Sequence, residues 1–252
     1  MIILMHSSKT MRQPASAAQP ASTPALLGKA SELIEHLRRL TPDQLSKLMS
    51  ISEELASKTK AQYDAWTAEP VAPAAETFVG DIYSGLQIDS FSAADRRYAN
   101  EHVRILSGLY GILRPFDGIS PYRLEMGYKL PGLNLYQFWG AHIAAQLPPS
   151  GRIVNLAAVE YSKTVTKYVD AGRVVTPKFL TVDPASGQPK FIVVHAKIAR
   201  GCFARWLVKR QAEDLTGFDD IGYAYDKTLS SDREPVFVCE EFGGKGLSVR
   251  LT

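Results

Sequence analysis

Hydrophobic residues follow a helical spacing over much of the first hundred positions. Residues 26–40 repeat apolar side chains at intervals that place them on one face of an α-helix. Thr41 and Gln44 then have the spacing of a capping box, with proline at the first helical position. The helical pattern continues to Trp66, and the prolines just beyond it end the helix. We therefore expect two successive helices, followed by a loop inside one domain.

Another helix is predicted to begin at Ser92. Asp95 stands three positions later, as in helix capping, and apolar residues continue along one stripe as far as Leu106. This helix would run directly into residues 108–111, which read Gly-Leu-Tyr-Gly. A helix, a glycine hairpin and a short helical turn in succession resemble a helix-hairpin-helix, whose hairpin offers backbone N–H groups to a DNA phosphate.

The rest of the chain is richer in strand patterns. The predicted strands are residues 1–5, 152–156, 173–182, 190–196 and 235–240. Turn residues at 183–187 indicate a hairpin between two of them, and residues 197–213 are expected to form a helix. The low-complexity residues 13–24 predict a flexible surface loop, and the glycine-rich residues 243–252 predict a flexible C-terminal tail.

Composition limits the classes of protein that fit. With 252 residues and 45% hydrophobic content, the chain is long enough for a substantial core. A net charge of +3 is below the strongly basic level of many nucleic-acid-binding domains, so a DNA-binding surface would need clustered charge. The apolar start is too short for a signal peptide and no later run has membrane-spanning length. We expect a cytoplasmic protein without membrane contact, and we favour a monomer.

The sequence indicates no metal site and no cofactor. The five histidines show neither HxH nor HExxH spacing, and no phosphate-binding lysine loop or dinucleotide fingerprint stands in a suitable context. Cys202 and Cys239 lie far apart without a ligand spacing. We interpret both as buried, reduced thiols.

Residues 106–127 are the most informative segment. Arg114 and Arg123 flank a turn rich in proline and glycine, and fixed guanidinium groups suit contacts with phosphate or carboxylate. Internal pairing with Asp117 and Glu125 is the alternative for these arginines.

Three other groups of residues carry candidate chemistry. Lys9 follows the first strand in a polar loop, where it would hold a phosphate or remain a solvated surface lysine. Glu160 and Lys163 are one helical turn apart, on a solvated face or on a cleft wall. Lys197 and Arg200 begin a basic half of their helix, which suits either a phosphate track or a solubilising surface.

The chain resembles the YaaA peroxide-stress family. Residues 108–115 and 121–127 match the signature of that family, and the likeness extends from the first strand to about Val238. Further matching blocks are residues 8–10, 80–87, 135–140, 155–163, 196–201 and 215–218. The family's usual Ser-Pro-Ala before the lysine is replaced here by His-Ser-Ser at residues 6–8.

The resemblance implies an intracellular protein that limits free iron and the DNA damage it drives under hydrogen peroxide. It also implies an α+β fold, a single large domain over residues 1–252 with a mixed sheet, flanking helices and a helix-hairpin-helix-like element. A positively charged cleft would bind duplex or branched DNA without strong sequence specificity. The predicted DNA-binding residues are Lys9, Gly108, Gly111, Arg114, Arg123, Lys129, Lys163, Lys197, Arg200 and Arg205.

An enzyme that acts on a small anionic substrate is the competing hypothesis. Its predicted catalytic residues are Lys9, Glu125, Glu160 and Lys197, with Tyr83, Arg123 and Tyr161 as further polar groups. Such mixed sets indicate catalysis when they converge in one pocket. A wide basic groove would favour DNA, whereas a deep pocket around Lys9, Glu125 and Lys197 would favour chemistry. An iron-handling or interaction protein fits less well, because the sequence has no iron-ligand cluster.

Overall fold

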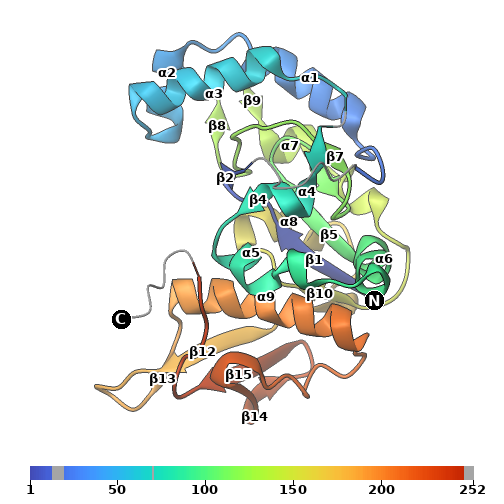
Figure 1. Ribbon diagram of the computed structural model, residues 1–252, viewed down its shortest axis with the longest axis vertical. Helices are drawn as coiled ribbons and strands as arrows, with labels where there is room; N and C mark the ends of the chain where they lie inside the picture. Colours follow the sequence, from blue (N-terminus) through green and yellow to red (C-terminus); the bar gives the residue numbers. More distant parts are fainter. Residues whose placement is uncertain (13–19, 70, 247–252) are drawn as a thin grey trace.

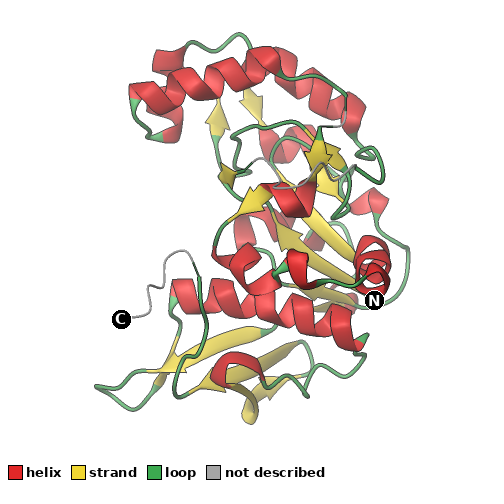
Figure 2. Ribbon diagram, viewed as in Figure 1, coloured by secondary structure: helices red, strands yellow, loops and turns green. Residues whose placement is uncertain are grey.

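The computed structural model describes residues 1–12, 20–69 and 71–246 (Figures 1 and 2). At its centre is a mixed sheet with the strand order β11-β10-β1-β5-β6. Its strands are β1 (Ile2–His6), β5 (Val103–Ser107), β6 (Gly111–Leu113), β10 (Ile153–Asn155) and β11 (Val174–Val175). Strand β1 is parallel to both β5 and β10, whereas β6 is antiparallel to β5. The prediction of a buried first strand is confirmed, since every residue of β1 is buried.

A second mixed sheet has the order β13-β12-β15-β14. Its strands are β12 (Lys178–Val182), β13 (Pro189–Lys190), β14 (Tyr223–Ser231) and β15 (Glu234–Cys239). Helix α9 (Val193–Arg210) lies between this sheet and the rest of the molecule (Figure 1). Phe203 of α9 packs against Phe179 and Phe237 of the sheet, with ring centroids 5.6 and 5.3 Å apart. The helix is thus buried on both sides.

Three helices form the end of the molecule farthest from the second sheet (Figure 1). They are α1 (Leu27–Leu37), α2 (Pro42–Met49) and α3 (Glu53–Ala65). The predicted capping box is confirmed, because Thr41 accepts the Gln44 N–H and Gln44 accepts the Thr41 N–H. The expected helix to Trp66 is instead two helices. Ser50 adopts a left-handed conformation that ends α2, and Ser52 caps α3.

Short elements complete the fold around the central sheet. The helices are α4 (Ala74–Thr77), α5 (Asp81–Leu86), α6 (Ala93–His102), α7 (Leu135–Trp139) and α8 (Val159–Thr166). The strands are paired as β2 (Thr10–Met11) with β4 (Phe78–Val79), β3 (Ala72–Pro73) with β7 (Gly118–Ile119), and β8 (Lys129–Leu130) with β9 (Leu133–Asn134). Single 3₁₀ turns are η1 (Ile88–Ser90), η2 (Ala144–Gln146), η3 (Ala171–Arg173) and η4 (Asp220–Gly222). The predicted α+β class with a mixed sheet and flanking helices is confirmed.

The expected helix-hairpin-helix-like element is wrong. Helix α6 begins as predicted after Ser92, which caps it, but it ends at His102. The next residues form β5, and the glycine segment turns the chain into antiparallel β6, so the element is a β-hairpin. The apolar residues Ile105 and Leu106 were assigned to a helix stripe, although they are fully buried in the central sheet. A strand buried inside a sheet, here between parallel β1 and antiparallel β6, produces the same apolar pattern over so few residues.

The structure also changes other element boundaries that were predicted from the sequence. The hairpin of β12 and β13 is confirmed, but residues 193–196, expected as strand, form the first turn of α9. Residues 13–19 and 247–252, the larger parts of the predicted loop and tail, lie outside the described residues. Nearby, Ala21 donates its N–H to the Phe116 carbonyl at 2.9 Å, and Gly243 donates to the Ile221 carbonyl at 3.2 Å. Within the described residues, we find no helix that combines the length and apolarity needed to cross a membrane.

Candidate active site

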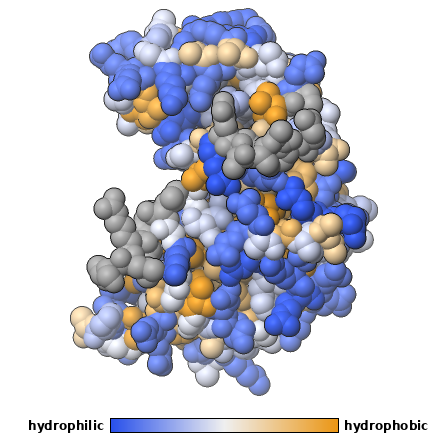
Figure 3. Space-filling view, viewed as in Figure 1, coloured by the Kyte–Doolittle hydropathy of each residue, from blue (hydrophilic) through white to orange (hydrophobic). Residues whose placement is uncertain are grey.

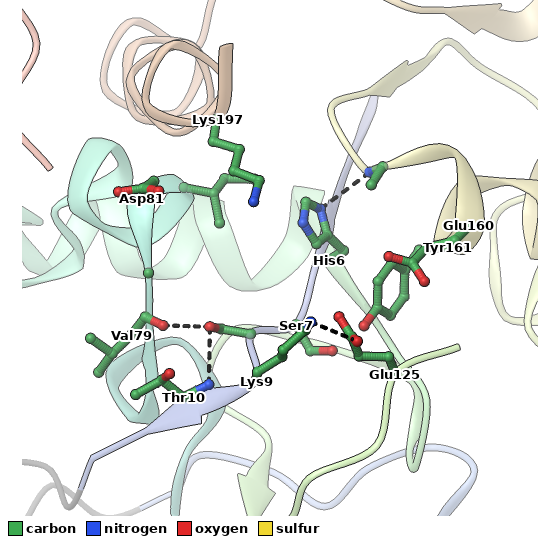
Figure 4. A pocket seen from close by; sticks show the side chains of 14 residues that line it. His6, Ser7, Lys9, Thr10, Val79, Asp81, Glu125, Glu160, Tyr161 and Lys197 are labelled. Carbon is green, nitrogen blue, oxygen red and sulfur yellow. Dashed lines mark hydrogen bonds and ion pairs between the residues drawn. The ribbon is translucent and has the colours of Figure 1, made fainter. Parts of the chain in front are cut away.

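A cavity of about 510 Å³ lies beside the carboxyl ends of β1 and β10 (Figure 4). It is lined by His6, Ser7, Ser8, Lys9, Thr10, Val79, Gly80, Asp81, Ile82, Glu125, Ala158, Glu160, Tyr161 and Lys197. Strand β1 lies between β5 and β10. The later strands β5 and β6 lie on one side of β1, and β10 and β11 lie on its other side, so the sheet has a topological switch point at β1. Sheets of this kind bind ligands outside the carboxyl ends of their strands, at such a switch point.

The loop after β1 supplies the first wall of the cavity. Lys9 Nζ lies 2.9 Å from Glu125 Oε2, and the Lys9 side chain is 50% exposed. The Ser8 hydroxyl donates to the Val79 carbonyl and accepts the Thr10 N–H. These bonds tie the loop to β4. The backbone is thereby held in a shape that keeps Lys9 at the cavity.

Two carboxyl groups face the cavity in different surroundings. Glu125 is paired with Lys9, whereas Glu160 on α8 is hydrogen-bonded by the backbone N–H of Gly127. Burial raises the pKa of Glu160, and the negative charge of Glu125 raises it further. Glu125 is therefore ion-paired, whereas Glu160 takes up a proton more readily than an ordinary glutamate. A carboxyl group whose pKa is raised by its surroundings suits a role in proton transfer.

Gly127 leaves room for the Glu160 carboxylate. A Cβ atom at this position would lie 2.8 Å from Glu160 Oε2, which is closer than non-bonded carbon and oxygen atoms approach. Only glycine lets the backbone N–H come this near the carboxylate.

His6, the last residue of β1, is a neutral imidazole. Its Nδ1 accepts the Ala158 N–H at 3.2 Å, so the proton of the neutral ring is on Nε2. Burial lowers the pKa of His6 to about 3, and the charges of Arg200 and Lys197 add to the effect. The ring stacks on Tyr161, with centroids 5.2 Å apart. The Nε2 edge faces the side from which Lys197 enters (Figure 4), where it can donate to an acceptor.

Buried hydroxyl groups form the back of the cavity. The Ser7 hydroxyl is hydrogen-bonded to the phenols of both Tyr122 and Tyr161. Tyr122 in turn hydrogen-bonds Ser107 Oγ at 2.7 Å. Burial raises the pKa of both tyrosines, which therefore stay protonated at neutral pH. The network is polar and uncharged.

A close contact between α5 and α9 brings Asp81 and Lys197 to the opposite wall (Figure 4). Gly201 of α9 faces α5, and a Cβ there would lie 1.9 Å from the Ile82 carbonyl oxygen. Gly85 of α5 faces α9 in the same way, with a Cβ 2.1 Å from the Ile198 carbonyl oxygen. Both helices can approach this closely only because both positions lack a side chain.

The four residues of the enzyme hypothesis meet in this cavity: Lys9, Glu125, Glu160 and Lys197. Tyr161 joins them, and Tyr83 lies behind the wall, where its hydroxyl donates to the His6 carbonyl at 2.9 Å. Arg123 is adjacent, since its Nη1 donates to the Lys9 carbonyl at 3.4 Å.

The other predicted DNA-binding residues do not converge on the cavity. Arg205 is ion-paired with Asp220, and Arg200 is half-buried beside the cavity without lining it. Lys163 lies over the ring of Tyr136 in a neighbouring cavity. Lys129 is exposed on β8 and Arg114 lines a separate small cavity.

We expected Gly108 and Gly111 to lie in an exposed hairpin that binds a phosphate, but the structure places them differently. Both are buried. A Cβ on Gly108 would lie 2.4 Å from the Leu124 carbonyl oxygen, and one on Gly111 would lie 2.8 Å from the Trp139 ring. Gly111 also has a φ of +69°, which favours glycine. These glycines allow close internal packing.

Sequence reasoning missed His6, Ser7 and Asp81. His6 ends a buried strand and Ser7 follows it, in a polar segment where binding groups often lie, but Lys9 alone was given a role there. Asp81 stands in one of the matching blocks and begins α5. Among the described residues, we find no group of three or more His, Cys, Asp or Glu side chains arranged to hold a metal ion.

Fold and site together define an α+β protein with a polar, mixed-charge cavity at the carboxyl edge of a parallel sheet region. A family model described as peroxide stress protein YaaA matches residues 1–229. The chain belongs to this peroxide-stress family. A UPF0246 protein of Salinispora tropica is 53% identical over 258 residues, which cover 99% of this chain and 98% of that protein. A UPF0246 protein of Cellvibrio japonicus is 43% identical over 234 residues, covering 86% and 90%.

Proposed function

We propose that this peroxide-stress protein is an enzyme that acts on a small anionic substrate in the cavity after β1. The proposal depends on one observation: Lys9, Glu125, Glu160 and Lys197, from four distant segments, line the same cavity of about 510 Å³. This volume is within the usual range for small-molecule sites. A mixture of lysines and carboxyl groups suits binding of an anion next to acid–base chemistry.

Each residue has a role that follows from its surroundings. Lys197 enters the cavity as an exposed cation and holds the anionic group of the substrate. Glu160, whose pKa is raised, exchanges a proton with the reacting atom. His6 donates a hydrogen bond from Nε2 to an oxygen on which negative charge develops, because it remains neutral. Lys9 and Glu125 fix the position of the loop by their ion pair.

A screen of phosphorylated and carboxylated metabolites tests the proposal, with binding followed by calorimetry and conversion by mass spectrometry. We expect a ligand whose affinity falls at least tenfold in Lys197→Ala, since a charge-assisted contact contributes about 1.5–3 kcal/mol. Glu160→Gln should bind that ligand and fail to convert it. Lys178→Ala, which removes a surface pair with Glu234, is the control. Equal binding and conversion by all variants would contradict the proposal.

DNA binding is the second candidate, favoured by the hollow in the surface between the helical end and α9 (Figure 3). Elements that line the cavity, β4, α5 and α9, border this hollow (Figure 1). Lys9 and Lys197 are exposed at the cavity. In this candidate the protein binds duplex or branched DNA through phosphate contacts without strong sequence specificity. It would protect cells from hydrogen peroxide by limiting free iron and the DNA damage it drives.

A gel-shift titration of duplex, junction and single-stranded DNA across ionic strength tests this candidate. Affinity should fall steeply with salt, and Lys197→Ala should reduce the slope of log affinity against log salt by about one. Lys178→Ala should leave the slope unchanged. Association that is insensitive to salt would rule the candidate out.

A further inference from the structure

A second, small cavity lies at the opposite edge of the central sheet from the candidate active site. Its volume is about 160 Å³, and its polar lining comes from Thr23, Arg104, Arg114, Asp117 and Gln146. Arg104 is near the amino end of β5, whereas the candidate active site lies beyond the carboxyl ends of β1 and β10. The two cavities therefore share no residue.

The register between β5 and β6 places two arginines opposite each other. Ile105 of β5 pairs with Leu113 of β6, so continuing the antiparallel register places Arg104 opposite Arg114. Residues opposite one another in antiparallel strands project from the same face, and like charges there destabilise the pair. Burial lowers the pKa of Arg104, and the charge of Arg114 lowers it further. Such an arrangement needs negative charge nearby.

Asp117 supplies only part of that charge. Its Oδ1 accepts the Ser22 hydroxyl at 2.6 Å, and its Oδ2 accepts the Arg114 backbone N–H at 2.7 Å. Both oxygens are thus bound by neutral donors, and neither arginine forms an ion pair within the described part of the chain. Two guanidinium groups and one carboxylate leave a net charge of +1 at the cavity.

Most guanidinium donors of the pair have no partner within the described residues. Arg104 uses Nη1 alone, which donates to the carbonyls of Asn100 at 3.1 Å and Val103 at 2.8 Å. The Arg114 side chain donates to no described group. Guanidinium forks match the geometry of a tetrahedral oxyanion and bind it through parallel N–H bonds.

We propose that Arg104 and Arg114 form an oxyanion site that binds a phosphate group. The cavity volume of 160 Å³ suits a single phosphate rather than a whole nucleotide, since small-molecule sites usually exceed about 300 Å³. The phosphate would be inorganic, or would be carried by a larger molecule such as nucleic acid whose remainder lies outside the cavity. The site is independent of the proposed enzyme activity.

Binding of two probes to the full chain tests the site: inorganic phosphate by calorimetry and duplex DNA by fluorescence anisotropy. Arg114→Gln is the main variant, because Arg114 is exposed and its loss should leave the fold intact. Arg104→Lys keeps the charge and removes the fork. Arg39→Gln, an exposed arginine outside every cavity described above, is the control.

We expect Arg114→Gln to weaken binding of at least one probe tenfold or more, Arg104→Lys to weaken it less, and Arg39→Gln to bind normally. Loss of phosphate binding identifies a free phosphate compound as the ligand, and loss of DNA binding alone identifies the nucleic-acid backbone. Lys197→Ala, in the other cavity, should not affect phosphate binding here. If Arg114→Gln changes neither probe's affinity, the site does not exist.

Discussion

At the scale of single residues, the candidate active site depends on His6 remaining uncharged. A buried imidazole with two cationic neighbours is neutral in the folded protein, whereas in the unfolded chain it titrates near its ordinary pKa of 6.5. Only a neutral ring can accept the Ala158 N–H on Nδ1 and donate from Nε2. The ring is therefore a fixed donor whose charge does not change over the physiological pH range.

This difference predicts how stability depends on pH. Because the folded-state pKa of His6 is lowered to about 3, the unfolded state binds the extra proton below pH 6.5. Stability from His6 is therefore present above pH 6.5 and is lost as pH falls toward 3. The slope contributed by one group is at most about 1.4 kcal/mol per pH unit. Urea unfolding of wild type and His6→Gln at pH 7, 6 and 5 should show the variant's relative stability improving as pH falls. A constant difference would contradict this account.

Gly127 predicts the behaviour of Glu160. In Gly127→Ala, a Cβ placed 2.8 Å from Glu160 Oε2 should push the carboxylate away from the backbone N–H. Losing a hydrogen bond to the charged form raises a carboxyl pKa further. Carbon-13 NMR titration of the glutamate carboxyl groups should show this rise. Gly28→Ala, whose Cβ would meet nothing within 4 Å, is the control. An unchanged Glu160 titration would show that Gly127 does not position this group.

At the scale of elements, the contact between α5 and α9 positions one wall of the cavity. Gly85 and Gly201 let the helix backbones touch, which brings Asp81 and Lys197 to the same space. We expect Gly201→Ala to separate the helices, because its Cβ would fall 1.9 Å from the Ile82 carbonyl oxygen.

The expected cost of Gly201→Ala is about 3 kcal/mol, the upper part of the range for overpacking a core. Thermal unfolding monitored by circular dichroism measures it. Gly28→Ala, at an open position in α1, should be neutral or slightly stabilising. Equal melting temperatures for Gly201→Ala and wild type would mean that the helices are not held by this contact.

Local signals in the sequence predicted some elements correctly and failed on others. The Thr41–Gln44 capping box is a contact between near neighbours, so it can be recognised without the fold. Strand β1 was recognised as a continuous apolar run. Strand β5 was mistaken for helix because its short apolar pattern fits both. Strand β14 was missed because most of its residues are not buried and it lacks an apolar run.

At the scale of the whole molecule, the sequence indicated four residues that line one cavity but could not choose between functions. Lys9, Glu125, Glu160 and Lys197 were proposed together because their side chains include the types needed for acid–base chemistry and for holding an anion. Their meeting depends on the order β10-β1-β5 and on the packing of α9 against α5, which are long-range features. Arg114 was predicted to bind DNA together with Lys9 and Lys197, although the fold places it at the other edge of the sheet.

The most direct test of the central claim is to map a bound anion by amide NMR chemical-shift changes. We expect the largest changes at Ser7, Lys9, Asp81, Gly127 and Lys197, because these residues surround or adjoin the cavity beside β1. The same titration on Lys197→Ala should require at least tenfold more ligand. Changes confined to other surfaces, with no response from the loop after β1, would contradict the assignment of this cavity as the active site.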